Sequence, residues 1–340
     1  MLPVAVVILN HNGAHHLERF LPSVLSHSTC ASVIVADNGS SDGSVTWLKE
    51  NYPAVRIISF PENYGFCGGY NRALAQIEEP VSVLLNSDVE VQPNWIEPIV
   101  ELFESSATLA VVQPKIKSLE QPDSFEYAGA AGGYIDAFGY PFCRGRIFSD
   151  IEKDSGQYDR DQEVFWASGA CFFVRTELFN RFGGFDDDFF AHMEEIDLCW
   201  RLKNNGYTVL ASGQAAVYHL GGGTLAQTDP RKTYLNYRNG FMLLVKNLAP
   251  AEMIWKLPAR ALLDMISVVK YTLSGEVRQG LMVLKAHGYI WKRFRRIAGK
   301  RSGPHLSMHL LSGTLNRLLL LDYYLLGKKR FDRLNLEAAQ

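Results

Sequence analysis

The chain has 340 residues, of which 47% are hydrophobic and 21% charged, and its formal net charge is -2. This ordinary globular composition leaves room for one large domain and an appendage, and it excludes a low-complexity chain. Five scattered cysteines without CxxC spacing argue against a zinc site and a disulfide framework. They indicate a reducing compartment.

The small net charge hides an asymmetry along the chain. Residues 1–264 carry 20 Lys and Arg against 32 Asp and Glu, whereas residues 265–340 carry 14 against 4. The sequence therefore predicts an acidic body followed by a basic tail region.

The first 90 residues alternate between short β-branched runs and helix-like stretches at 17–27 and 42–52. This alternation predicts right-handed βαβ units, and hence an α/β fold whose mostly parallel central sheet is covered on both faces. The opening "MLPVAVVILNHNG" has no positively charged region before its apolar run, so we expect a first strand and not a signal peptide. The predicted strands are "VAVVIL" (4–9), "SVIVA" (32–36), "VRIIS" (55–59) and "VSVLL" (81–85).

Each of these runs is followed by a polar segment. A single polar strand end is usually a solvent-facing turn, but the carboxyl ends of parallel strands share one edge of the sheet, where ligands bind. Four such ends at one edge predict a binding site. They read "NHNG" (10–13), "DNGSSDG" (37–43), "PENYGFCGGYN" (61–71) and "NSDVE" (86–90).

The remainder of the chain divides into three parts. Residues 115–165 are rich in glycine and aromatic residues and give no clear pattern. An amphipathic helix is predicted over 193–203, ended by "NNG". From about residue 231 the pattern becomes helical and basic, which predicts a catalytic domain over 1–230 and a C-terminal region over 231–340.

Several polar residues of the first strand ends are candidates for ligand contact. Asp37 either forms an Asx turn with Asn38-Gly39 or accepts the N3–H of a uracil or thymine base. The glycines of "NYGFCGGYN" do not form a GxGxxG dinucleotide motif, yet they could bring backbone close to a ligand framed by Asn63 and Asn71.

Asp88 and His219 are candidates for a metal site. A nucleotide diphosphate leaving group needs its charge neutralised, and Asp88 could supply a hard oxygen ligand to a divalent cation, with Asn86 or Glu90 nearby. A lone histidine on an apolar segment is more often structural. His219, however, stands between an apolar run and three glycines, which is typical of a loop mouth.

An acidic cluster begins the predicted helix at 193–203. Asp197 and Arg201 are four residues apart, and a surface ion pair explains Asp197. Glu194 and Glu195 have no such partner, so either could act as a general base that deprotonates a sugar hydroxyl.

Six segments together resemble the family 2 glycosyltransferases, which are inverting nucleotide-sugar enzymes of the GT-A fold, and in particular their bacterial rhamnosyltransferase-like branch. The resemblance covers roughly residues 4–225. The matching segments are "VVILNHNG" (6–13), "VIVADNGSSDGS" (33–44), "ENYGFCGGYNRAL" (62–74), "VLLNSDVEVQPNWI" (83–96), "SGACFFVRTELFNRFGGFDDDFFAHMEEIDLCWRLKNNGY" (168–207) and "VYHLGGGT" (217–224).

The resemblance implies roles for several residues. Asp88 corresponds to the metal-binding aspartate of the DxD motif, although the motif here reads "NSD", and His219 corresponds to a metal-binding histidine of some members. The base of the family's "ED" pair falls on Glu194-Glu195, with Asp197 kept as a third candidate. The implied donor-binding residues are Asn10, Asp37, Asn63, Gly65, Asn71, Asn86, Ser87 and Arg238.

The implied reaction is a single displacement. The acceptor hydroxyl, deprotonated by Glu195, attacks the anomeric carbon of a dTDP- or UDP-linked sugar such as rhamnose, while Mg²⁺ or Mn²⁺ stabilises the departing diphosphate. The acceptor would be a glycan or lipid-linked glycan of a cell-surface polysaccharide. Two alternatives are a GT-A-fold binding protein that has lost catalysis, and an oxidoreductase, which the missing GxGxxG disfavours.

The C-terminal region contains an acid-free run with seven Lys or Arg between Lys285 and Arg301. Trp291, Phe294 and Ile297 recur among them at helical spacing. We expect this segment to lie on an anionic membrane surface, which would place the enzyme on the inner face of the cell membrane without a spanning helix. The alternatives are a basic helix packed on the catalytic domain and a helix that binds nucleic acid. We favour the membrane surface over both, and we expect no nucleic acid partner.

Overall fold

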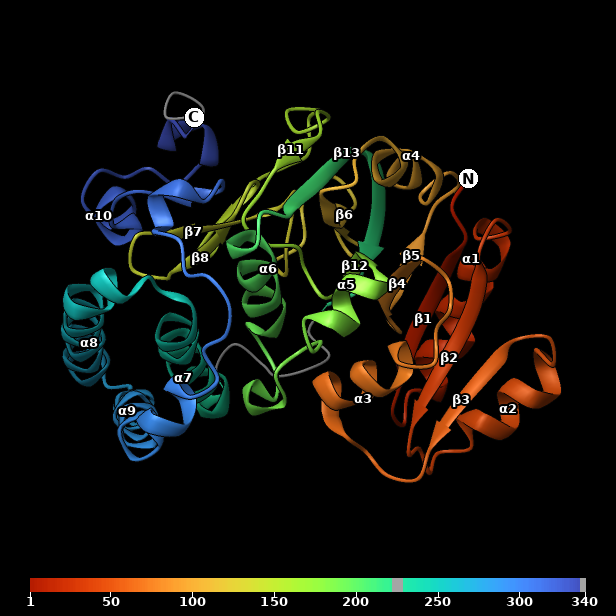
Figure 1. The fold of residues 1–340 in the computed structure, drawn as a ribbon, viewed down its shortest axis with the longest axis horizontal. Coiled ribbons are helices and arrows are strands. Elements are labelled where there is room, and N and C mark those ends of the chain that lie inside the picture. The colour runs from red at the N-terminus through yellow and green to blue at the C-terminus, as the bar shows by residue number, and fades with distance from the viewer. Residues whose placement is uncertain (222–228, 337–340) are drawn as a thin grey trace.

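A computed structural model describes residues 1–221 and 229–336. Its centre is a nine-stranded mixed sheet (Figure 1). Eight strands follow one another across the sheet, and β5 (Val89–Val91) pairs with β13. The order of the eight is β11 (Gln162–Glu163), β13 (Thr208–His219), β6 (Leu109–Ser118), β12 (Cys171–Arg175), β4 (Val81–Asn86), β1 (Val4–Asn10), β2 (Ser32–Asn38) and β3 (Arg56–Phe60).

The four predicted strands are confirmed as β1 to β4, and they form a parallel unit. The other half of the sheet is mixed, because β12 runs antiparallel to both β4 and β6. Strand order reverses between β1 and β4, since the chain moves outward from β1 through β2 and β3 and then returns to the other side. Such a switch point leaves a crevice at the carboxyl ends of the strands.

Helices cover both faces of the sheet. β1 shows why: Val4, Val6 and Ile8 pack into one core cluster, while Ala5 and Val7 pack into the other. The first cluster also contains side chains of α1 (Ala14–His27), α2 (Ser44–Asn51) and α4 (Glu97–Ser105). The second contains those of α3 (Gly65–Leu74), α5 (Thr176–Arg181) and α6 (Glu194–Asn204). The helix predicted over 193–203 is confirmed as α6.

A second, five-stranded sheet accounts for much of the segment that the sequence left unassigned. Four of its strands are only two to four residues long, which explains why no periodicity announced them. The fifth comes from near the C-terminus and lies parallel to β7. The order is β10 (Asp150–Ile151), β9 (Arg146–Ile147), β8 (Pro141–Cys143), β7 (Gly133–Asp136) and β14 (Thr314–Leu315).

The C-terminal region is largely helical and belongs to the same core as the second sheet. Its helices are α7 (Pro230–Asn247), α8 (Pro250–Leu273), α9 (Val277–Ala298) and α10 (Leu319–Tyr324), and Figure 1 shows them gathered on one side of the molecule. Ile290, Ile297 and Leu315 are buried in the shared core cluster. Within 1–221 and 229–336, no helix is both long and apolar enough to cross a membrane.

Candidate active site

The ends of β1 and β2 are joined by a buried polar network. Asn10 and Asp37 lie opposite each other in the parallel register. The Asn10 amide nitrogen donates to Asp37 Oδ1 (3.1 Å), Ser40 Oγ (3.1 Å) and Ser44 Oγ (2.9 Å). These bonds fix the shape of the loop after β2, because its hydroxyls and carboxylate all converge on one amide.

The loop before α3 is held in a similar way. Asn63 Oδ1 accepts hydrogen bonds from the Asn38 side chain (3.0 Å) and the Gly65 N–H (2.8 Å). Gly65 has φ +71°, a left-handed conformation that glycine adopts without steric cost. Asn71 lies further along α3 and bonds the backbone of Phe185 through both ends of its amide, at 2.8 and 2.9 Å. It therefore ties α3 to the loop ahead of α6.

The pairing of β5 with β13 brings Asp88 and His219 together. His219 is the last residue of β13 and lies opposite Val89, so its ring reaches the residue before β5. His219 Nε2 lies 3.1 Å from Asp88 Oδ1 and 3.4 Å from the Asn86 amide nitrogen. The two predicted metal ligands, 131 residues apart in the chain, are thus direct neighbours.

Glu126 contacts the opposite side of the same imidazole. Sequence reasoning missed this residue because it lies in the unassigned segment. Its Oε2 is 3.4 Å from His219 Nδ1 and also accepts the Ala128 N–H. Burial alone would lower the pKa of His219, but hydrogen bonds to Asp88 and Glu126 outweigh it and raise the pKa to about 9. A carboxylate behind a histidine is the arrangement that orients metal-binding imidazoles.

The Asp88–His219 pair has a donor set that suits a divalent cation. A carboxylate oxygen and an imidazole nitrogen are ligands that Mn²⁺ accepts, and Mg²⁺ favours the oxygen. Within the described part of the chain, no three His, Cys, Asp or Glu side chains are arranged to enclose a metal. Two protein ligands nevertheless fit a cation that takes its other ligands from phosphate and water.

Glu194 and Glu195 occupy the first turn of α6. The loop before them contains three non-glycine residues with positive φ, namely Phe190 (67°), His192 (68°) and Met193 (74°). A positive φ strains the backbone of a non-glycine residue, and such residues cluster at functional sites. Both glutamates line the cavity described below, and each has a buried Oε2 atom without a hydrogen-bond partner. Burial raises the pKa of both, and the charge of Glu195 raises that of Glu194 further.

Asp197 and Arg238 have structural partners instead. Asp197 is fully buried and bonds Arg201 Nε (2.9 Å), Lys246 Nζ (2.9 Å) and the Asn247 amide (2.8 Å). The Arg238 guanidinium donates to the carbonyls at 188 and 189, at 3.1 and 2.6 Å. Neither residue lines the cavity.

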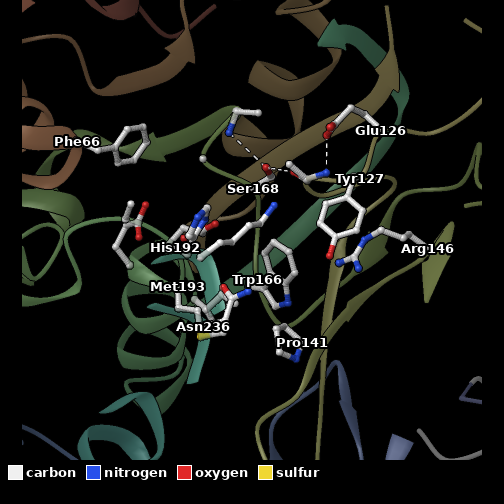
Figure 2. Close-up of a pocket in the computed structure, with 18 of the residues that line it drawn as sticks. Phe66, Glu126, Tyr127, Pro141, Arg146, Trp166, Ser168, His192, Met193 and Asn236 are labelled. Carbon is white, nitrogen blue, oxygen red and sulfur yellow. Dashed lines mark hydrogen bonds between the residues drawn. The ribbon is translucent and has the colours of Figure 1, made fainter. Parts of the chain in front are cut away.

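A single cavity of about 1430 Å³ joins these groups. Of the residues predicted from the sequence, it is lined by Asn63, Gly65, Asn86, Ser87, Asp88, Glu194, Glu195 and His219. Asn10, Asp37 and Asn71 stand behind the lining with Asp197 and Arg238. Figure 2 shows lining residues that the sequence did not indicate: Tyr127 and Arg146 lie near Glu126, and Trp166 lies between them and His192.

The fold is that of GT-A glycosyltransferases. The structure resembles GalNAc-T7 crystallised with UDP, GalNAc and Mn²⁺ (TM-score 0.57, 16% identity, covering 74% of this chain and 49% of that one). It also resembles S. aureus TarS 1–349 in complex with UDP-GlcNAc (TM-score 0.56, 15% identity, covering 88% and 84%). At these identities the likeness concerns the fold alone.

The chain belongs to glycosyl transferase family 2, whose family model matches residues 5–183, and it is therefore a glycosyltransferase. It is 30% identical over 233 residues to the N-acetylglucosaminyl-diphospho-decaprenol L-rhamnosyltransferase of Mycobacterium tuberculosis, covering 63% of this chain and 75% of that protein. It is 26% identical over 214 residues to the rhamnosyltransferase WbbL of Escherichia coli K12, covering 60% and 78%.

Proposed function

We propose that the protein is an inverting glycosyltransferase that moves a sugar, with rhamnose the leading candidate, from a dTDP- or UDP-linked donor to a lipid-linked glycan. The observation that carries this proposal is that one cavity is lined both by the Asp88–His219 pair and by two glutamates whose buried Oε2 atoms have no hydrogen-bond partner. The first can neutralise a leaving diphosphate, and the second can take a proton from a hydroxyl.

In this proposal the donor lies at the strand ends. That part of the cavity is lined by Asn63, Gly65, Asn86 and Ser87. The Asn10–Asp37 network supports the loop that would surround the nucleobase. Asp88 and His219 would hold a Mg²⁺ or Mn²⁺ ion, which supplies positive charge to the diphosphate oxygens. Glu126 keeps the His219 ring in the orientation that directs Nε2 toward Asp88.

Glu195 is the proposed general base. It accepts the proton of the acceptor hydroxyl as the oxygen forms its bond to the anomeric carbon and the bond from that carbon to the diphosphate breaks. Because the attack comes from the face opposite the leaving group, the product has the inverted configuration. Glu194 lies beside it, and burial together with the charge of Glu195 raises the pKa of Glu194.

The proposed acceptor and location have support from the similar proteins and from the surface. The name of the mycobacterial relative describes transfer to a lipid-linked sugar, which supports an acceptor in a membrane. We propose that the protein lies on the inner face of the cell membrane. Exposed apolar side chains on the C-terminal helices support this, among them Trp291 (76% exposed), Leu262 and Val269.

The test is a donor screen on the full chain with Mn²⁺ or Mg²⁺. Release of nucleoside diphosphate from dTDP-rhamnose and from UDP-sugars would be measured with and without a sugar-bearing polyprenyl-diphosphate acceptor, and the anomeric configuration of the product by NMR. Stimulation by the acceptor, loss in Glu195→Gln and an inverted product are expected. Tight donor binding without turnover on any acceptor would instead indicate the catalytically inactive binding protein.

A further inference from the structure

The cavity extends beyond the glutamates into a part that neither a nucleotide nor a sugar needs. This part is bounded by α8 on one side and by the segment 318–325, which includes α10, on the other. Its walls are largely apolar. The lining side chains include Leu263, Ile266 and Tyr271 from α8 and Leu318, Leu321 and Leu325 from the other segment.

This apolar part of the cavity opens at the molecular surface. Ile266, Leu321 and Leu325 line it and are 57%, 50% and 76% exposed. An open groove with aliphatic walls is unfavourable in water and is typical of a surface that receives hydrocarbon. The groove is continuous with the part of the cavity that contains the glutamates. A hydrocarbon chain bound in the groove could therefore be joined to a group that reacts at the glutamates.

Cationic groups stand where the polar and apolar parts meet. Arg146 is 7% exposed and lines the cavity, and its Nε is buried without a hydrogen-bond partner. Its guanidinium carbon lies 4.4 Å from the centre of the Tyr127 ring, and Lys232 Nζ lies 5.5 Å from that centre. Among the described residues, neither cation forms an ion pair with a carboxylate. The charge of Glu126 favours the charged form of both groups without forming an ion pair with either. A buried guanidinium without such a pair is stabilised when an anion joins it.

Arg146 is also connected to the apolar groove. Its Nη1 donates a hydrogen bond to the Phe148 carbonyl (3.1 Å). The Phe148 ring centre lies 6.0 Å from the ring centre of Tyr324 at the end of α10. Tyr324 in turn lines the groove, and its hydroxyl accepts a hydrogen bond from Lys270 Nζ (3.4 Å). Buried positive charge followed by aliphatic walls matches a phosphorylated head group followed by a long chain.

We propose that this end of the cavity binds the lipid diphosphate of the acceptor, with the phosphates at Arg146 and Lys232 and the isoprenoid chain between α8 and α10. The inference rests on the proposed function, because it assigns the acceptor half of the same site. The acceptor sugar is thereby carried to Glu195, and the chain leaves the protein through the opening at Ile266 and Leu325.

The experiment measures binding of farnesyl diphosphate to the full chain by calorimetry, below the concentration at which the lipid forms micelles. Inorganic pyrophosphate and farnesol serve as half-ligands, and UDP with Mn²⁺ serves to occupy the donor site. Farnesyl diphosphate should bind in the presence of UDP and Mn²⁺, at least tenfold more tightly than either half-ligand. Binding that UDP and Mn²⁺ abolish would overturn the proposal, since the probe would then occupy the donor site.

Variants place the probe in the groove. Ile266→Glu and Leu321→Glu should weaken farnesyl diphosphate at least tenfold and leave UDP binding unchanged. Leu281→Glu is the matched control, because Leu281 on α9 is similarly exposed (54%) and does not line the cavity. Equal weakening by all three variants would contradict the groove. Arg146→Gln tests the buried cation, but this variant could fail to fold. Lys232→Gln therefore tests the less buried cation separately. Weakened UDP binding in Lys232→Gln would assign this charge to the donor site.

These measurements are independent of the proposed function. Donor hydrolysis without acceptor reports the glycosyltransferase site alone. Active hydrolysis with no farnesyl diphosphate binding would refute the groove and leave the proposed function intact. Binding of farnesyl diphosphate without hydrolysis of any donor would count against the proposed function and leave the groove proposal intact.

Discussion

Three acidic residues within four positions of α6 have different environments. The Oε2 atoms of Glu194 and Glu195 are buried without partners, whereas the Asp197 carboxylate is shared by Arg201, Lys246 and Asn247. The sequence indicated the Arg201 pair by its spacing. It could not indicate Lys246, because that contact depends on how α7 packs against α6.

Glu195→Gln should lower turnover by roughly 10²–10⁴-fold, the usual contribution of a general base, with little change in donor binding. The glutamine keeps the shape of the side chain and removes only its ability to accept the proton. Single-turnover rates and donor Kd would be measured for this variant and for Glu194→Gln. If Glu194→Gln shows the larger loss of rate, the base is Glu194.

The raised pKa values of the two glutamates predict a pH dependence. A general base acts in its deprotonated form, so turnover should rise with pH through the raised pKa of Glu195 and then level off. The pH profile of kcat/KM would be compared between the wild type and Glu195→Asp, which keeps a carboxylate. A profile that is flat down to the pKa of an ordinary carboxyl group would contradict the assignment.

Asp88→Ala should abolish transfer and weaken binding of nucleoside diphosphate in the presence of Mn²⁺, because the cation loses an anionic ligand. Binding of Mn²⁺ would be measured directly by electron paramagnetic resonance. Glu126→Gln keeps the ring contact without the charge and should weaken Mn²⁺ by roughly 10–100-fold, the usual effect of a group that orients a metal ligand. Unchanged Mn²⁺ affinity in Asp88→Ala would remove Asp88 from the site.

At the scale of elements, local pattern predicted β1 to β4 because each is a short β-branched run, and α6 because its apolar residues have helical spacing. The same reasoning singled out Asp88 and His219, since both stand at strand ends next to polar or glycine residues, and the fold brings the two side chains together. It missed Arg146, because a strand of two residues has no period to detect, and it missed Glu126, because that residue lies in a loop between β6 and β7. It also placed Asn71 at the donor, whereas that side chain bonds the backbone of Phe185.

Ion pairs of Lys246 connect α7 to α6 and to the loop that precedes α6. Lys246 Nζ lies 2.6 Å from Asp186 and 2.9 Å from Asp197. Replacing one partner of such a pair leaves the other charge buried, so Lys246→Met should lower the free energy of unfolding by about 3–5 kcal/mol. Urea denaturation at neutral pH measures this, with Lys246→Arg as the control that keeps the charge. A loss below 1 kcal/mol would mean that the pairs contribute little.

For the whole molecule, the acidic body and the basic tail meet directly. Arg296 pairs with Asp188 (2.7 Å), and Lys300 pairs with Asp186 (2.5 Å) and Asp188 (2.6 Å). Phe294 and Ile297 pack toward the core, while Trp291 is 76% exposed. Part of the basic run therefore packs on the catalytic domain, and only its remaining charges are free for an anionic surface.

Lys292→Gln combined with Arg293→Gln should weaken binding to anionic vesicles by roughly 2 kcal/mol, at about 1 kcal/mol for each charge, and the effect should vanish at high salt. Both residues are exposed, and no carboxylate of the described chain pairs with them. Arg296→Gln with Lys300→Gln is the matched control, because those charges are already paired. Co-sedimentation with neutral and anionic vesicles decides it; equal loss in both double variants would argue against docking through this helix.

The parallel pairing of β14 with β7 has a consequence for biosynthesis. Residues 133–136 leave the ribosome long before residues 314–315, so this edge of β7 stays unpaired until residues 314–315 have been made. An exposed strand edge is a site at which other chains can add. A nascent chain stalled before residue 314 is therefore expected to need chaperone protection, and the sheet that carries Arg146 gains its β14 edge only after residue 315 has been made.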